Sequence, residues 1–270
     1  MGRSTIEIFT MLIDSIGRMS EVQSIGKSGG RELPTANESD IDIFVFCTEL
    51  PSADKRQAQI AGLDDSIVDL KLSTVEGKPW GMCDFVQING VEICLMYFTI
   101  AKMHAEIESI LNGERLEKED NYFYPTGRCA TFLSMHILLD KHNFITAMKE
   151  KVSVFPDELA KKLIAHHMHR INDVEDFERA VSRKDVLFYH FALDNAIDHY
   201  LQVLFARNKC FFPSRKRTIL HIDGFQAKPI HCAQRLIHVI ELGGRADTLT
   251  QSYDSWSCLC KDLAIIVNGS

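Results

Sequence analysis

The hydrophobic pattern of this chain changes near residue 115, and that change limits the folds open to it. Before residue 115, short runs rich in β-branched and aromatic residues alternate with helical stretches. After it, apolar residues recur at the spacing of one face of an α-helix. We therefore expect an α+β fold, with a mixed sheet and helices over residues 1–115 followed by an all-α helical bundle domain over residues 116–270.

Local signals predict where the elements lie. Ser4 and Glu7 have capping-box spacing and begin a helix that ends near Gly17. Asn89-Gly90 separates two strand-like runs, which is a strong short-range signal of a β-hairpin. In the first domain the expected strands are 22–25, 40–46, 83–88 and 91–99, and the expected helices are 53–63 and 100–111. In the second domain the expected helices are 128–139, 156–171, 174–181, 185–206, 228–242 and 246–267.

The composition is that of a folded chain with reduced cysteines. The 270 residues are 46% hydrophobic and 25% charged, and no apolar run reaches the length of about 18 residues that a membrane helix needs. The first residues carry Glu7 and Asp14 and have the pattern of an amphipathic helix instead of a secretion signal. None of the eight cysteines forms a Cys-x-x-Cys pair. We expect a cytoplasmic protein with no membrane partner.

Negative charge is concentrated in the first domain. Residues 1–115 contain 10 Lys and Arg against 18 Asp and Glu. Such a surface repels the phosphate backbone of nucleic acids unless metal ions intervene, and it suits divalent cations or a cationic substrate. Broad nucleic-acid binding is therefore not expected.

Two aspartates on one strand form the first candidate site. Because side chains alternate along a strand, Asp40 and Asp42 project from the same side while Ile41 and Ile43 point to the other. Neighbouring carboxylates favour a shared cation, and hard oxygen ligands favour Mg²⁺. Glu92, on the second strand of the expected hairpin, would add a third carboxylate that acts either as a general base or as a metal ligand.

A glycine loop precedes these aspartates. Backbone without Cβ approaches phosphate closely, so Gly29 and Gly30 are candidate phosphate contacts, and Ser28 adds a hydroxyl donor. Lys27 and Arg31 flank the loop as cations and complete the candidate nucleotide-binding set at this position.

Together, Gly29-Gly30, a spacer of nine residues, and Ser39-Asp40-Ile41-Asp42-Ile43 resemble the signature of nucleotidyltransferases of the DNA polymerase β-like superfamily. The resemblance implies a polymerase β-like mixed sheet and a Mg²⁺-dependent enzyme. In that family the two acids hold Mg²⁺, with two ions expected, and a third acid on a later strand matches Glu92. The family's glycine motif holds nucleotide phosphate, a role carried here to Ser28, Gly29 and Gly30, with Ser39 beside the acids. One departure is that the serine precedes the glycines, whereas Gly-Ser is the commoner form.

The two-domain plan resembles that of aminoglycoside and lincosamide nucleotidyltransferases and their uncharacterised bacterial relatives. It implies transfer of a nucleoside monophosphate, most simply AMP from the substrate ATP, to a hydroxyl of a small-molecule acceptor such as an aminoglycoside-like antibiotic. In the second domain Arg215, Lys216 and Arg217 are candidate triphosphate contacts, and Lys216 is the preferred one.

Three other functions remain open at this stage. The enzyme could modify a protein hydroxyl, as AMP-transferring antitoxins do. Arg183 and His190 have a spacing similar to a motif of some helical ribonuclease domains. A third alternative is a nucleotide sensor that binds ATP without transferring any part of it.

Overall fold

The computed structural model describes residues 3–30, 33, 40–74, 79–120, 123–171 and 174–269. The chain forms two compact units. Unit 1 contains residues 1–109 and 128–154, and unit 2 contains residues 110–127 and 155–270. The chain therefore passes between the units three times, and the predicted division at residue 115 falls inside the short segment 110–127.

Unit 1 is built on a six-stranded mixed sheet with the strand order β3-β4-β5-β2-β1-β6. Only β2 and β5 pair in parallel; the other neighbours are antiparallel. The strands are β1 Val22–Lys27, β2 Ile41–Cys47, β3 Ile67–Lys71, β4 Met82–Ile88, β5 Val91–Thr99 and β6 His136–Asp140. Asn89-Gly90 joins β4 to β5 as predicted, so this hairpin places β5 beside β2 and its two aspartates.

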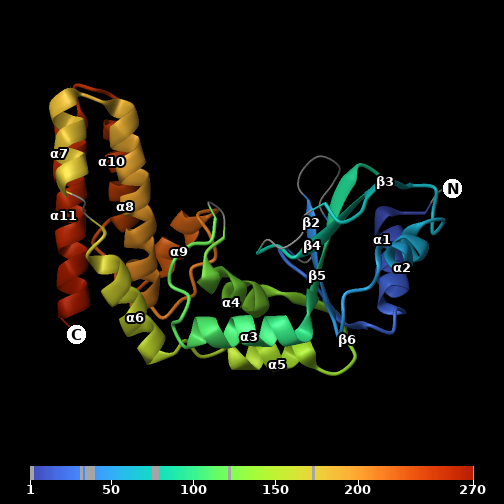
Figure 1. Cartoon of the computed structure of the whole chain (residues 1–270). Helices are drawn as coiled ribbons and strands as arrows, with labels where there is room; N and C mark the ends of the chain where they lie inside the picture. The colour runs from blue at the N-terminus through green and yellow to red at the C-terminus, as the bar shows by residue number, and fades with distance from the viewer. Residues whose placement is uncertain are drawn as a thin grey trace. The chain divides into compact units, whose positions relative to one another are not determined.

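Helices cover both faces of this sheet. On one face, α1 (Thr5–Gly17) and α2 (Ala53–Ile60) cover an aliphatic core, and Figure 1 shows them side by side in blue. The Ser4–Glu7 capping box that begins α1 is confirmed. On the other face, Phe46 stacks on Phe132 of α4 (Pro125–Ser134) and contacts Phe144 of α5 (Phe144–Lys151). Helix α3 (Ile100–Leu111) follows β5 directly, as the pattern predicts.

The prediction of one helix over residues 128–139 is wrong. The helix α4 ends at Ser134, and β6 then pairs antiparallel with β1 at the edge of the sheet. Gly26 on β1 leaves room for the Met135 side chain that precedes β6, because a Cβ at that position would lie 2.2 Å from the sulfur of Met135. A short apolar run fits a helix or a strand equally well, and here pairing with β1 decides between them.

Within its described residues, unit 2 contains only helices from Phe155 onward. Its helices are α6 Asp157–Met168, α7 Val174–Arg183, α8 Val186–Arg207, α9 Thr218–Gly224, α10 Cys232–Gly243 and α11 Leu249–Asn268. Figure 1 shows α7, α8, α10 and α11 running alongside one another, and Trp256 of α11 is fully buried in their shared core. The mixed α+β architecture with a helical carboxy-terminal part is thus confirmed, whereas the short α9 was not predicted.

No helix in the described ranges is long and apolar enough to cross a membrane.

Candidate functional site

Asp42 lies at the start of β2 on the aromatic face of the sheet, and Asp40 stands just before the strand. Asp42 is in register with Cys94 of β5, so the two side chains share a face. Asp40 is exposed and precedes the strand. A hydrogen bond with Cys83, followed by burial, raises the pKa of Cys94, and the negative charges of Asp42 and Asp40 raise it further. Both aspartates are therefore close enough to Cys94 to act on it electrostatically, and Cys94 stays a neutral thiol.

Glu92 lies two residues before Cys94 on β5, so its side chain points to the same face as Asp42. It is exposed, and it makes no hydrogen bond or ion pair with any part of the chain that the structure describes. The sheet thus places Asp42 and Glu92 on one face, and Asp40 directly precedes the strand that carries Asp42. Within the described residues, however, no three His, Cys, Asp or Glu side chains gather closely enough to form a metal site by themselves.

The donor set of this face fits magnesium. Asp40 and Asp42 offer hard carboxylate oxygens, and the nearest sulfur, that of Cys94, remains protonated. Mg²⁺ in nucleotide enzymes is commonly held by one or two carboxylates together with substrate phosphates and water. Two protein carboxylates are therefore sufficient, and a third ligand from the chain is not required.

The glycine loop begins directly beside Asp42. The backbone N–H of Ser28 donates to the carbonyl of Asp42 at 3.0 Å, and its hydroxyl donates to Asp42 Oδ2 at 3.3 Å. Gly29 adopts φ +82°, a left-handed conformation that favours glycine. A Cβ at Gly29 or Gly30 would meet no atom of the described residues within 4 Å. The structure brings the serine, the glycines and the aspartates together as the sequence predicts.

The remaining nucleotide-binding predictions have different outcomes. Lys27 is buried, and its ammonium donates to the carbonyl of Gly30. Arg31 and Ser39 lie outside the described residues. Lys216 is exposed in the loop before α9, where its backbone N–H donates to Ser214 Oγ at 3.1 Å, and its role as a phosphate contact stays a prediction.

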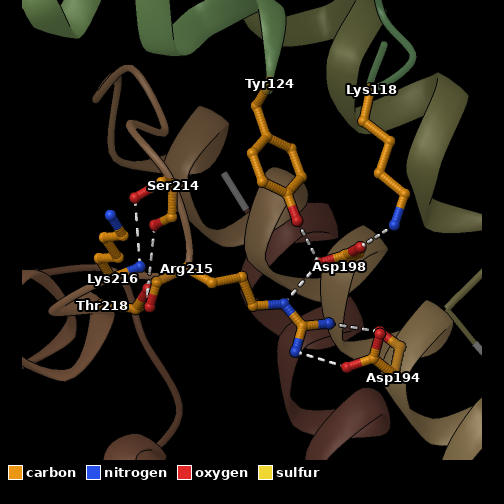
Figure 2. Close-up of polar contacts among 8 residues, drawn as sticks. All are labelled: Lys118, Tyr124, Asp194, Asp198, Ser214, Arg215, Lys216 and Thr218. Carbon is orange, nitrogen blue, oxygen red and sulfur yellow. Dashed lines mark hydrogen bonds and ion pairs between the residues drawn. The ribbon is translucent and has the colours of Figure 1, made fainter. Parts of the chain in front are cut away.

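A second polar site lies in unit 2 and was missed by sequence reasoning. Asp198 of α8 accepts hydrogen bonds from Lys118 Nζ and Tyr124 Oη, both at 2.6 Å, and from Arg215 Nε at 2.5 Å (Figure 2). Arg215 also donates to the Asp194 carboxylate at 2.8 Å. We call these five residues the Asp198 cluster. Although burial opposes ionisation, hydrogen bonds from Lys118 and Tyr124 and the charge of Arg215 lower the pKa of Asp198.

The Asp198 cluster changes the interpretation of Arg215, Lys216 and Arg217 as candidate triphosphate contacts. Arg215 is held by two aspartates and is therefore not available as a free phosphate contact. In Figure 2 the side chain of Lys216 runs away from the Asp198 cluster. The cluster consequently ties the loop before α9 to α8, and it leaves Lys216 exposed to solvent.

We expect Asp198→Asn to destabilise unit 2 by about 2–3 kcal/mol, because it leaves Lys118 and Arg215 without a buried counter-charge. The expected loss is smaller than the usual cost of breaking a fully buried ion pair, because the side chains of Lys118 and Arg215 are about one-third exposed. Urea unfolding followed by Trp256 fluorescence in a Trp80→Phe background measures the effect. The matched control is Asp262→Asn, which breaks the half-exposed pair with Arg235, whose carboxylate is far less buried than that of Asp198, and should cost about 1 kcal/mol or less. Equal losses in the two variants would contradict a supporting role for the cluster.

The histidines of α6 bond to other protein groups. His167 Nε2 donates to the Leu116 carbonyl at 3.1 Å, so its Nδ1 must accept from His199 Nδ1–H at 2.8 Å. Burial, followed by the charges of His199 and His166, lowers the pKa of His167 to about 3. Both rings of the pair are therefore neutral at pH 7.

This pair predicts a pH dependence of stability. The folded pKa of His167 lies below its unfolded value of about 6.5, so its contribution is complete above pH 6.5 and is lost as pH falls toward about 3. We expect the free energy of unfolding of the wild type to fall more between pH 7 and pH 4 than that of His167→Gln. Urea titrations of both proteins across this range test the prediction, and equal slopes would contradict it.

Comparisons with known proteins find similarity to a family profile and to solved structures. Residues 124–217 match a family profile described as "Domain of unknown function (DUF4037)", which covers less than half of the chain and includes most of the Asp198 cluster. The fold is similar to the crystal structure of a nucleotidyltransferase-like protein from Exiguobacterium sibiricum 255-15, with 11% sequence identity and a TM-score of 0.48 over 97% of this chain and 76% of that chain. No curated protein matches. Neither similarity transfers a substrate, a metal or a catalytic residue to this chain.

Proposed function

We propose that the protein is a Mg²⁺-dependent nucleotidyltransferase that transfers AMP from ATP to a hydroxyl group of a small-molecule acceptor. One observation carries this proposal. The glycine loop is hydrogen-bonded through Ser28 to Asp42 of β2, and Asp40 directly precedes that strand. A glycine loop suited to phosphate is thus joined by hydrogen bonds to one of the two candidate magnesium ligands.

Each group of residues has its own role in the proposed reaction. Ser28, Gly29 and Gly30 bind triphosphate oxygens through backbone N–H groups and a hydroxyl, and Asp40 and Asp42 hold the magnesium. When bound, magnesium neutralises charge on the triphosphate. Glu92 accepts the proton of the acceptor hydroxyl, whose oxygen forms a bond to the α-phosphorus while the bond to the leaving pyrophosphate breaks.

The negative charge around Asp42 on this face of the sheet also supports the proposal. Asp42 lies beside a neutral Cys94 and an exposed Glu92, so the protein groups here are acidic and a bare triphosphate would be repelled. Binding of ATP is therefore expected to require the divalent cation. It should be weak in EDTA and restored by Mg²⁺.

The proposal is tested by incubating the full chain with ATP, Mg²⁺ and pools of hydroxyl-bearing small molecules, aminoglycosides among them. Mass spectrometry should detect an acceptor that gains one AMP, together with released pyrophosphate. A gain of AMP on a protein instead would favour the protein-modifying alternative. Mg²⁺-dependent ATP binding with no transfer to any acceptor would favour the sensor, and absence of ATP binding would refute the proposal.

A further inference from the structure

Lys27 has an unusual position for a lysine. It ends β1, where it is in register with Ile43 of β2 and with His136 of β6, so the backbone is held from both sides. Directly opposite residues of an antiparallel pair share a face, which places Lys27 with Ile43 on the aliphatic face, opposite to Asp42. Only 5% of the residue is exposed.

The ammonium of Lys27 has one partner in the part of the chain that the structure describes. It donates to the carbonyl of Gly30, and no carboxylate of the described residues pairs with it. Burial lowers the pKa of this ammonium. An ammonium has three donors, and burying its charge is costly unless partners compensate, so a lysine at this position needs a reason other than packing.

The glycine loop is consequently fixed at both ends and from both faces of the sheet. Its first residue, Ser28, is tied to Asp42 on the aromatic face. Its last described glycine, Gly30, is tied to Lys27 from the aliphatic face. Between these two contacts, Gly29 and Gly30 have no described neighbour within 4 Å of a Cβ position. A glycine loop that is held by hydrogen bonds at both ends suits a ligand that binds to backbone.

We propose that Lys27 is a positioning residue that holds the glycine loop ready for nucleotide phosphate, a role that rests on the proposed function. The ammonium draws the Gly30 carbonyl toward the interior, so that this negative oxygen is kept from the phosphate. It also places a positive charge beneath the loop, where it favours an anion above it. Because the loop is ordered before binding, less conformational entropy is lost when phosphate binds.

The matched variants are Lys27→Met and Lys141→Met. Lys141 also donates to backbone carbonyls, those of Gly17 and Val22 at 2.7 and 2.8 Å, but outside the glycine loop. Removing Lys27 is expected to raise the Kd for MgATP about tenfold or more, the scale of one charge-assisted hydrogen bond, with turnover at saturating ATP nearly unchanged. Without nucleotide, the amide protons of Gly29 and Gly30 should exchange faster in Lys27→Met, whereas Lys141→Met should change neither readout.

Lys27→Gln keeps an N–H donor for the Gly30 carbonyl and removes the charge. It replaces Lys27→Met in these measurements if that variant folds poorly. If the amide protons of Gly29 and Gly30 still exchange slowly in this variant while MgATP binds more weakly, the positive charge of Lys27 is what favours the nucleotide. Unchanged glycine exchange together with unchanged MgATP affinity in the lysine variants would overturn the inference. If the wild type bound no nucleotide, the proposed function would fail, but the glycine exchange rates would still decide whether Lys27 holds the loop.

Discussion

Asp42→Asn is expected to reduce nucleotidyl transfer about a thousandfold or more and to remove the Mg²⁺ dependence of ATP binding. The amide keeps the size of the side chain and an oxygen that still accepts from the Ser28 hydroxyl, so the tie to the glycine loop survives. What is lost is the negative charge, and stabilisation by a bound metal ion amounts to several kcal/mol in such reactions. The same result is expected for Asp40→Asn.

Transfer rates and calorimetric titration of ATP with and without Mg²⁺ measure these effects. Asp65→Asn is the control, because Asp65 is an exposed aspartate of the same unit outside the proposed site. All three variants should unfold at nearly the same temperature as the wild type. Full transfer activity in both Asp40→Asn and Asp42→Asn would show that these carboxylates do not hold the metal.

Local patterns predicted most of unit 1 but not its edge. The helix α1, the β4–β5 hairpin and α3 follow from caps, turn residues and periodicity that lie within a few residues of one another. Strand β6 depends on pairing with β1, more than 100 residues earlier in the chain, and no local signal reports such a partner. One local signal did separate β6 from the next helix. Asp140, the last residue of β6, accepts hydrogen bonds from the backbone N–H groups of Ile145 and Thr146 in the first turn of α5.

The candidate site was predictable to the extent that it depends on strand alternation. Asp40, Asp42 and Glu92 were expected on one face, and the register of β2 with β5 places Asp42 and Glu92 there, whereas Asp40 precedes the strand. Lys27 was predicted as a nucleotide-binding cation that flanks the loop; it ends β1, whose register places its side chain on the face opposite to Asp42. The Asp198 cluster was not predictable, because Lys118 and Tyr124 lie 80 and 74 residues from Asp198 in sequence.

Glu92→Gln is expected to lower turnover about 10²–10⁴-fold with ATP affinity nearly unchanged, because a general base acts in the chemical step. Two observations favour the base over a metal ligand. Glu92 is exposed with no partner among the described residues, and no three acidic, histidine or cysteine side chains in that part of the chain gather into a metal site. An accessible, unpaired carboxylate can receive a proton from an incoming hydroxyl.

Single-turnover transfer rates and the Kd for MgATP, measured on the same preparations, separate the two roles. Gln87 lies directly opposite Glu92 on β4, so Gln87→Ala controls for local disturbance of the hairpin and should leave both quantities within about twofold of the wild type. A large loss of MgATP affinity in Glu92→Gln would place Glu92 in the metal shell. An unchanged turnover would instead require that another group, or water, takes the hydroxyl proton, since the oxygen must lose that proton as its bond to phosphorus forms.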